Sequence, residues 1–410
     1  MNKTIDNNCA ERIISALRLG IPPHNHVINF TVGRSQEIDR LKNILKKGEN
    51  SALLLLANYG SGKTHLLKLI REMALQENYA VSLIALDAKA AIKFNKMDQI
   101  FGTICRYIEI PNIENKGINY FFDFIVNIFK SLIKGDNIEQ FGVSYTDIKS
   151  KIYKISNNFK WNHCSFLSPA IYIALRAWFF GDTNTQNLTK DWLFNPWNYS
   201  NNASQKLLYS KLVKNLKNNF KDSRREWQFY EDDVFVFDKQ GYQQSWDALN
   251  DLDKLSKIIG LRGLILLIDE YEDVIHNLNN IKHQQSAFWN LFQFFSGEKF
   301  NNLAFFAVTP DFEHNCKTLL YEKNIWDYDY SRFDELDKFE LSHLSEEQLI
   351  DLGDKIADLH FKAYNWNMDK QSINSKIKNL CKDFMKISIQ DRVRHSIKKI
   401  ITMLDEFVED

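Results

Sequence analysis

Residues 57–64, with the sequence ANYGSGKT, combine the residue types that bind phosphate. Gly60 and Gly62 let the backbone turn its N–H groups around an anion, and the helix predicted to follow adds the partial positive charge of its N-terminus. The amine of Lys63 would reach the β and γ phosphates of a nucleotide, and the hydroxyl of Thr64 would bind Mg²⁺. This is a P-loop pattern with alanine in its first position, and it predicts a site for ATP and Mg²⁺. The other loop residues predicted to contact the nucleotide are Asn58, Tyr59, Ser61 and His65.

Two adjacent carboxylates, Asp269 and Glu270, end the apolar run GLILLIDE at 263–270. Such a pair is otherwise often an ordinary solvated turn. Here the run is strongly apolar and a P-loop occurs in the same chain, which favours a catalytic role. We therefore predict that Asp269 belongs to the Mg²⁺ shell and that Glu270 polarises the attacking water.

Thr309 stands at the end of the next apolar run, NLAFFAVTP at 302–310. A polar side chain at that point could sense the γ phosphate or the attacking water. The plainer alternative is a strand-end residue in front of Pro310.

The elements that must position these groups follow an α/β pattern. Strands are predicted at 52–56 and 80–87 with a helix at about 63–76 between them, and two further strands at 263–270 and 302–310. The last two runs are continuously apolar rather than alternating, as expected for strands covered on both faces. The sequence therefore predicts a parallel-sheet P-loop NTPase core.

Lys63 and Asp269 are separated by 206 residues, far more than a minimal core of this kind requires, so we infer an insertion between them. Its segments FFDFIVNIFKSLI and SPAIYIALRAWFFGD are typical of helices. The predicted organisation is an N-terminal helix and arm (1–28), the first half of the core (29–110), a helical insertion (111–245), the second half of the core (246–335) and a C-terminal helical lid (336–410).

Three arginines are candidates for contacting the nucleotide from outside the core. Arg332 lies in a predicted turn before an apolar residue and could enter a neighbouring subunit's site as an arginine finger. Arg392 and Arg394 lie in the predicted final helix, where either could close over the nucleotide. The alternative for each of them is an ordinary exposed arginine on the protein surface, which is the more common case.

The composition narrows the class of protein. Lys plus Arg and Asp plus Glu both number 52 among 410 residues, so the net charge gives no overall signature of a nucleic-acid or membrane partner. The five cysteines form no CxxC pair, which argues against a disulfide framework or a structural zinc site. No run approaches the length of a membrane span or a signal peptide, so we expect a cytoplasmic protein.

These motifs resemble the AAA+-related branch of P-loop ATPases. The segment FTVGRSQEIDRL resembles the glycine-arginine box that lies near the adenine in origin-recognition-like and STAND ATPases. More narrowly, ERIISALRLGIPP, YGSGKTHLL, LRGLILLIDEYEDV and FAVTPDF, in this order, resemble the ATP-binding proteins of bacteriophage-exclusion (BREX) systems, the BrxC/BrxD family. The resemblance implies an AAA+-like fold, a nucleotide contact from Gly33 and Arg34, and protein partners in a defence system, such as a helicase or another effector.

Three functions remain open at this point. The resemblance favours an ATPase that acts as a switch or motor subunit in antiphage defence. An ATP-gated DNA loader or clamp is the alternative, although only 18 residues follow Arg392, too few for the winged-helix domain of origin-recognition proteins. The third is a nucleotide-binding scaffold with low intrinsic turnover that a partner or nucleotide-dependent self-assembly would stimulate.

Overall fold

The computed structural model describes residues 5–48, 52–86, 92–134, 156–157, 160–161, 166–197, 237, 241–366 and 369–409. The remaining parts of the predicted insertion, and Asp87 at the end of a predicted strand, lie outside these residues. Among the described residues, no helix has both the length and the apolar character needed to cross a membrane.

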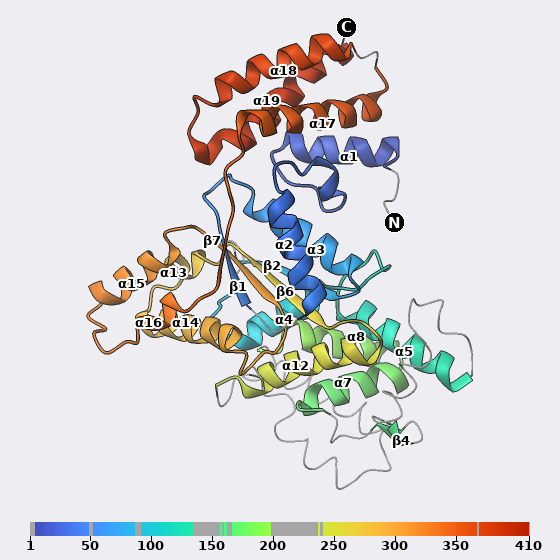
Figure 1. The fold of residues 1–410 in the computed structure, drawn as a ribbon. Helices are drawn as coiled ribbons and strands as arrows, with labels where there is room; N and C mark the ends of the chain where they lie inside the picture. The colour runs from blue at the N-terminus through green and yellow to red at the C-terminus, as the bar shows by residue number, and fades with distance from the viewer. Residues whose placement is uncertain are drawn as a thin grey trace.

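A six-stranded sheet forms the centre of the molecule (Figure 1). All neighbouring strands run parallel except the edge pair β2 and β3, which is antiparallel. Across the sheet the order is β3 (Ile108–Glu109), β2 (Ala80–Ala85), β6 (Leu264–Asp269), β7 (Ala304–Val308), β1 (Ala52–Leu56) and β8 (Lys338–Glu340). The predicted parallel α/β sheet is therefore confirmed. A separate two-stranded hairpin joins β4 (Ser156–Asn157) to β5 (Lys160–Trp161).

The central strands are apolar on both faces, as their continuous apolar runs predict. Side chains alternate along a strand, so Leu54 and Leu56 of β1 enter one core cluster while Leu53 and Leu55 enter the other. All five residues of β1 are buried. Helices cover both faces, and neither face of the central strands is left to solvent.

The first face is covered by helices from the insertion and from both halves of the core. Apolar residues of these helices join one continuous cluster with the sheet, so the insertion's described helices are part of the main core and not a separate body. In chain order the helices are α4 (Met97–Tyr107), α5 (Ile118–Lys134), α7 (Pro169–Phe180), α8 (Thr183–Phe194), α12 (Gln243–Ile258) and α14 (Ile281–Ser296). Three further helices border the same side, namely α13 (Asp273–Asn277), α15 (Phe312–Glu322) and α16 (Ser331–Asp334).

The second face is covered by α2 (Ser35–Lys47) and α3 (Lys63–Gln76). Beyond them lies a bundle that joins both ends of the chain, formed by α1 (Asn7–Arg18), α17 (Glu346–Tyr364), α18 (Lys370–Phe384) and α19 (Ile389–Glu409) (Figure 1). We call these four helices the lid bundle. The predicted capping box of Ser345 and Gln348 starts α17.

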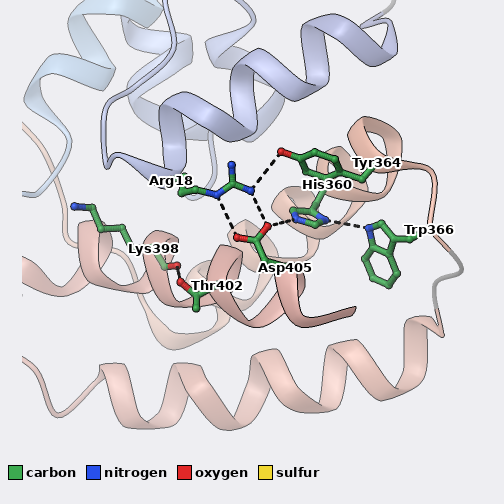
Figure 2. Close-up of polar contacts among 7 residues, drawn as sticks. All are labelled: Arg18, His360, Tyr364, Trp366, Lys398, Thr402 and Asp405. Carbon is green, nitrogen blue, oxygen red and sulfur yellow. Dashed lines mark hydrogen bonds and ion pairs between the residues drawn. The ribbon is translucent and has the colours of Figure 1, made fainter. Parts of the chain in front are cut away.

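A polar network fastens α1 to the C-terminal helices (Figure 2). Arg18 binds the Asp405 carboxylate at 2.6 Å and also donates to the hydroxyl of Tyr364. Asp405 in turn contacts Nε2 of the buried His360 at 3.0 Å. Because the indole of Trp366 can only donate, Nδ1 of His360 accepts from it and Nε2 carries the proton toward Asp405. Burial lowers the pKa of His360, which keeps this neutral tautomer.

Three of the expected domain boundaries do not coincide with the way the elements pack. The N-terminal helix packs with α17 and α19, and so it lies in the same bundle as the C-terminal helices rather than forming a unit of its own. The predicted start of the lid at 336 precedes β8, which pairs with β1 as the sixth strand of the sheet. The predicted end of the insertion at 245 falls inside α12.

Candidate functional site

A cavity lies where the carboxyl ends of β1 and β6 meet the lid bundle. Its walls come from the P-loop and α3, from the turn after β6, from the chain around 20–34, and from α17 and α19. Many side chains toward the lid bundle are apolar, while those at the sheet edge are polar. The sequence-predicted residues that line it are Arg34, Tyr59, Gly60, Ser61, Gly62, Lys63, Thr64, His65, Asp269, Glu270 and Arg394.

The predicted P-loop at 57–64 adopts the tight turn that its glycines permit. Gly60 and Gly62 have φ of 73° and 100°, in the left-handed region that glycine enters without strain. Within the loop, the backbone N–H and the hydroxyl of Ser61 both donate to the carbonyl of Asn58. Gly62 is the N-cap of α3, so the unpaired N–H groups of that helix start in the cavity wall. This arrangement can bind an anion such as a phosphate group.

Thr64 and Asp269 form an oxygen pair at the sheet edge. The Thr64 hydroxyl donates to Oδ2 of Asp269 at 2.7 Å. Asp269 is buried, and burial raises the pKa of its carboxyl group although Thr64 and nearby cations oppose the shift. A hydroxyl and a carboxylate are ligands that Mg²⁺ accepts, so these residues fit that ion.

A cation here would need further oxygen ligands from outside the protein. Among the residues that the structure describes, no group of three or more His, Cys, Asp or Glu is arranged to hold a metal ion. Mg²⁺ commonly binds through one or two protein ligands together with substrate phosphates and water. The arrangement therefore suits an ion that arrives with a phosphorylated ligand.

Lys63 is engaged by a carboxylate that the sequence reasoning did not single out. Its amine, in a residue that is 8% exposed, forms an ion pair with Glu272 and lies 4.6 Å from the ring centre of Tyr59. Glu272 also lines the cavity. The signal was present in the motif DEYE at 269–272, where a third acidic residue follows Glu270 after one aromatic residue.

Glu270 occupies a turn that sends the chain back toward the cavity. Its φ of 56° lies in the left-handed region, which is uncommon for a residue with a side chain. The backbone N–H of Glu270 donates to Oδ1 of Asp269, and its carbonyl accepts from the N–H of Asp273. Both predicted carboxylates thus reach one site, as the sequence motif requires.

The glycine-arginine box lies where the core meets the lid bundle. Gly33 has a φ of 61°, and a Cβ there would fall 2.3 Å from the side chain of Gln348 on α17. Arg34 is buried and donates to the carbonyl of Ser342 at 2.5 Å and to Glu37 at 3.1 Å. It also reaches the Ser61 carbonyl at 3.5 Å. Arg34 therefore connects the P-loop to the segment that leads from β8 to α17, while Gly33 itself is not a cavity-lining residue.

The arm before this box is held on the outer side of α3. Lys68 donates to the carbonyl of Pro22, Arg71 to that of His24, and Glu72 accepts from the backbone N–H of Val27. These three side chains lie three and four residues apart, on one face of the helix. The helix that begins at the P-loop therefore also fixes the arm that closes one side of the cavity.

His65 packs beneath the arm and stays neutral. Its Nε2 lies 2.8 Å from the Thr31 hydroxyl, and its ring meets Phe30 edge-on at 5.3 Å. Burial, together with the charges of Arg34 and Lys68, lowers the pKa of His65 to about 4. These contacts fix the His65 ring between the arm and the start of α3.

We expect acid to destabilise the protein through His65. Because its folded-state pKa of about 4 lies below the ordinary 6.5, the unfolded chain binds more protons between these values. The stabilisation is complete above about pH 6.5 and is lost as the pH falls toward 4. Between pH 7 and pH 5 the loss in the free energy of unfolding is about 2 kcal/mol.

Urea denaturation at pH 7 and at pH 5 measures this loss, with His65→Gln as the control. The Gln variant should lose about 2 kcal/mol less than wild type over the same pH interval. An identical pH dependence in the two proteins would contradict the assignment.

The remaining predicted residues lie off the cavity wall. Thr309 follows β7, the strand between β1 and β6, so it is at the same sheet edge but is not a cavity-lining residue. Arg332 on α16 packs its guanidinium 4.4 Å from the ring centre of Phe292. Arg392 donates to the carbonyls of Met385 and Ile387 and lines a small neighbouring pocket. Of the two arginines of α19, Arg394 is the one in the main cavity.

A comparison with protein families identifies the group to which the chain is related. The model of the BREX system ATP-binding protein BrxC/D family matches residues 5–217 and 238–410. The chain belongs to this family. The expected resemblance is thereby confirmed, and the family is one that binds ATP and operates in a BREX system. No curated protein and no solved structure matches the chain.

Proposed function

We propose that the protein is a Mg²⁺-dependent P-loop ATPase with an AAA+-like core that serves as a switch or motor subunit in antiphage defence. The observation that carries the proposal is the convergence of four polar residues at one sheet edge, in a cavity closed by the lid bundle. These residues are Lys63, Thr64, Asp269 and Glu270. The family description supports ATP as the ligand and a defence system as the context.

The P-loop and α3 would bind the phosphates. The backbone N–H groups at Gly60 and Gly62 and the N-terminus of α3 would supply partial positive charge to the phosphates, and Lys63 would add a full charge. Thr64 and Asp269 would hold Mg²⁺, which when bound supplies charge neutralisation on the phosphate oxygens. The apolar side chains of the arm and lid bundle, which include Ile21 and Leu352, would receive the base.

Glu270 would orient the attacking water. It lines the cavity one residue beyond Asp269, so an acceptor for the water's proton lies beside the metal-binding carboxylate. Thr309, at the end of the strand between β1 and β6, would sense the γ phosphate from its position at the same edge.

Phosphate release by the purified protein tests this function. We expect turnover with ATP that requires Mg²⁺ and that Asp269→Asn lowers strongly, because that change removes the metal's carboxylate ligand. Turnover that persists unchanged in excess EDTA, or in Asp269→Asn, would refute the metal assignment.

Arg394 is the better candidate for the arginine of the lid bundle. It lines the main cavity, whereas the Arg392 side chain is occupied by backbone carbonyls of the α18–α19 connection. Arg394→Ala should weaken ATP binding about 10-fold, the value of one hydrogen bond to a charged group. Arg392→Ala, the matched control, should leave ATP affinity within about twofold of wild type. Titration with a fluorescent ATP analogue measures the affinity of both variants. A larger loss of affinity in Arg392→Ala than in Arg394→Ala would assign the nucleotide contact to Arg392.

Arg332 would act only on another copy of the chain. It packs against Phe292 and is not among the residues that line its own cavity. Sizing the protein with and without ATP and Mg²⁺ tests this role, since a protein that stays monomeric in every nucleotide state would leave Arg332 without a site to enter.

One observation favours the alternative of a DNA-binding loader or clamp. Residues 370–399, in α18 and α19, contain nine Lys or Arg and only two acidic residues, within a chain of zero net charge. Measuring DNA affinity at several salt concentrations tests this function, because neutralised phosphates release counterions and give a steep salt dependence.

A further inference from the structure

The cavity holds a third carboxylate, Glu272, for which the proposed hydrolysis has no use. Glu272 is 4% exposed, lines the cavity and forms an ion pair with the amine of Lys63. Lys63 is also the residue whose positive charge would bind the phosphates of a nucleotide. The same amine therefore has two competing anionic partners.

The fold holds Glu272 firmly in this position. Tyr271, between the two glutamates, is fully buried, and its hydroxyl donates to the carbonyl of Ala287 while its ring packs edge-on against Phe94 and Phe306. With Tyr271 anchored in the core, the residues on either side of it return to the cavity. The pairing with Lys63 is thus a property of the turn after β6 and not of a mobile surface side chain.

Only one of the two carboxylate oxygens of Glu272, Oε1, is paired with Lys63. Within the described part of the chain, its Oε2 is buried and accepts no hydrogen bond. A buried charge with an unmet oxygen is costly, and this cost is tolerated only while the partner charge remains. Lys63 and Glu272 therefore hold each other in the absence of a stronger anion.

We propose that Glu272 occupies, on Lys63, the place that a nucleotide's β and γ phosphates take, so that ATP binding exchanges one anion for another on the same amine. The inference rests on the proposed nucleotide site and adds a positioning residue to it. The exchange of anions on Lys63 would favour nucleotides with several phosphates, because a ligand with a single phosphate lacks the groups that would displace Glu272 from Lys63.

The test compares nucleotide affinities of Glu272→Gln and wild type. With the competing charge removed, ATP should bind at least about 10-fold more tightly in the variant, the value of one charge-assisted hydrogen bond. AMP, measured by competition with the same fluorescent analogue, should change by less than about twofold. Without nucleotide the variant should melt at a lower temperature than wild type, because Lys63 is left without its counter-charge, and ATP with Mg²⁺ should raise its Tm by more than it raises that of wild type.

Glu270→Gln is the matched control, since it removes the same charge from the same cavity wall two residues away. It should gain much less ATP affinity than Glu272→Gln. An equal gain in the two variants, or an equal gain for AMP and ATP, would show a general charge effect and overturn the exchange. A folded Glu272→Gln protein with wild-type ATP affinity would also overturn it while leaving the nucleotide site intact. If wild type itself binds no ATP, the proposed function fails and this inference fails with it.

Discussion

Glu270→Gln is expected to lower phosphate release at least about 100-fold while the protein still binds ATP. Gln keeps the size and the hydrogen-bonding reach of the side chain but cannot accept the proton of the attacking water. Glu270 lies in the cavity beside Asp269, which we assign to the metal, so the loss falls on the chemical step and not on binding. Single-turnover phosphate release measures the chemical step, and an ATP titration measures binding.

Glu272→Gln supplies the comparison for this prediction. Both changes remove a carboxylate from the DEYE motif, but only Glu270 is assigned to the water. Substantial and equal turnover in wild type and Glu270→Gln would remove that assignment. A large loss in Glu272→Gln alone would transfer it to the second glutamate.

Lys63→Met is expected to destabilise the protein by about 3 to 5 kcal/mol in addition to weakening ATP binding. The change leaves Glu272 buried without the charge that compensates it, and one of its oxygens already lacks a hydrogen bond within the described residues. Loss of activity in a variant of the P-loop lysine would therefore mix unfolding with the loss of a phosphate contact. Urea denaturation without nucleotide measures the loss of stability by itself.

The double variant Lys63→Met with Glu272→Leu separates these effects. Replacing both members of a buried ion pair with apolar residues of similar size is often neutral for stability, so most of the lost free energy of unfolding should return. ATP affinity should not return, because the amine is absent. A double variant no more stable than Lys63→Met would show that the ion pair is not the source of the loss.

The strand, turn and helix around the predicted phosphate loop could be predicted closely because their signals are local. The strand, glycine turn and helix at 52–76 are contiguous in the chain, and the predicted helix 63–76 coincides with α3. Asp269 could be placed because an apolar run that ends in carboxylates marks a buried strand and its exit. Parallel pairing then brings the carboxyl ends of such strands to one edge.

The pairing of Lys63 with Glu272 could not be predicted, because it joins residues 209 positions apart and depends on the turn at Glu270. The choice between Arg392 and Arg394 depends on helical phase. Two residues differ by about 200° around a helix, so only one can face the cavity, and the sequence of α19 alone does not say which.

The packing of the chain's outer segments depends on contacts that the sequence does not show. The short edge strand β8 has only three residues, too few for a recognisable pattern, so the sequence does not show that the sheet continues beyond residue 336. The apolar stripe of α1, which includes Ile13, Ile14 and Leu17, shows that the helix needs a partner but does not identify α17 and α19 as that partner. Amphipathic patterns reveal which face is buried, whereas packing partners are set by the whole fold.

We propose that the cavity between the sheet edge and the lid bundle is a site for ATP with Mg²⁺. Isothermal titration calorimetry of wild type and of the folded Lys63→Met, Glu272→Leu variant tests it most directly. We predict one saturable ATP site per chain in wild type that tightens with Mg²⁺, and at least about 10-fold weaker binding in the variant. Equal ATP binding by the two proteins, or no binding by wild type, would contradict the claim.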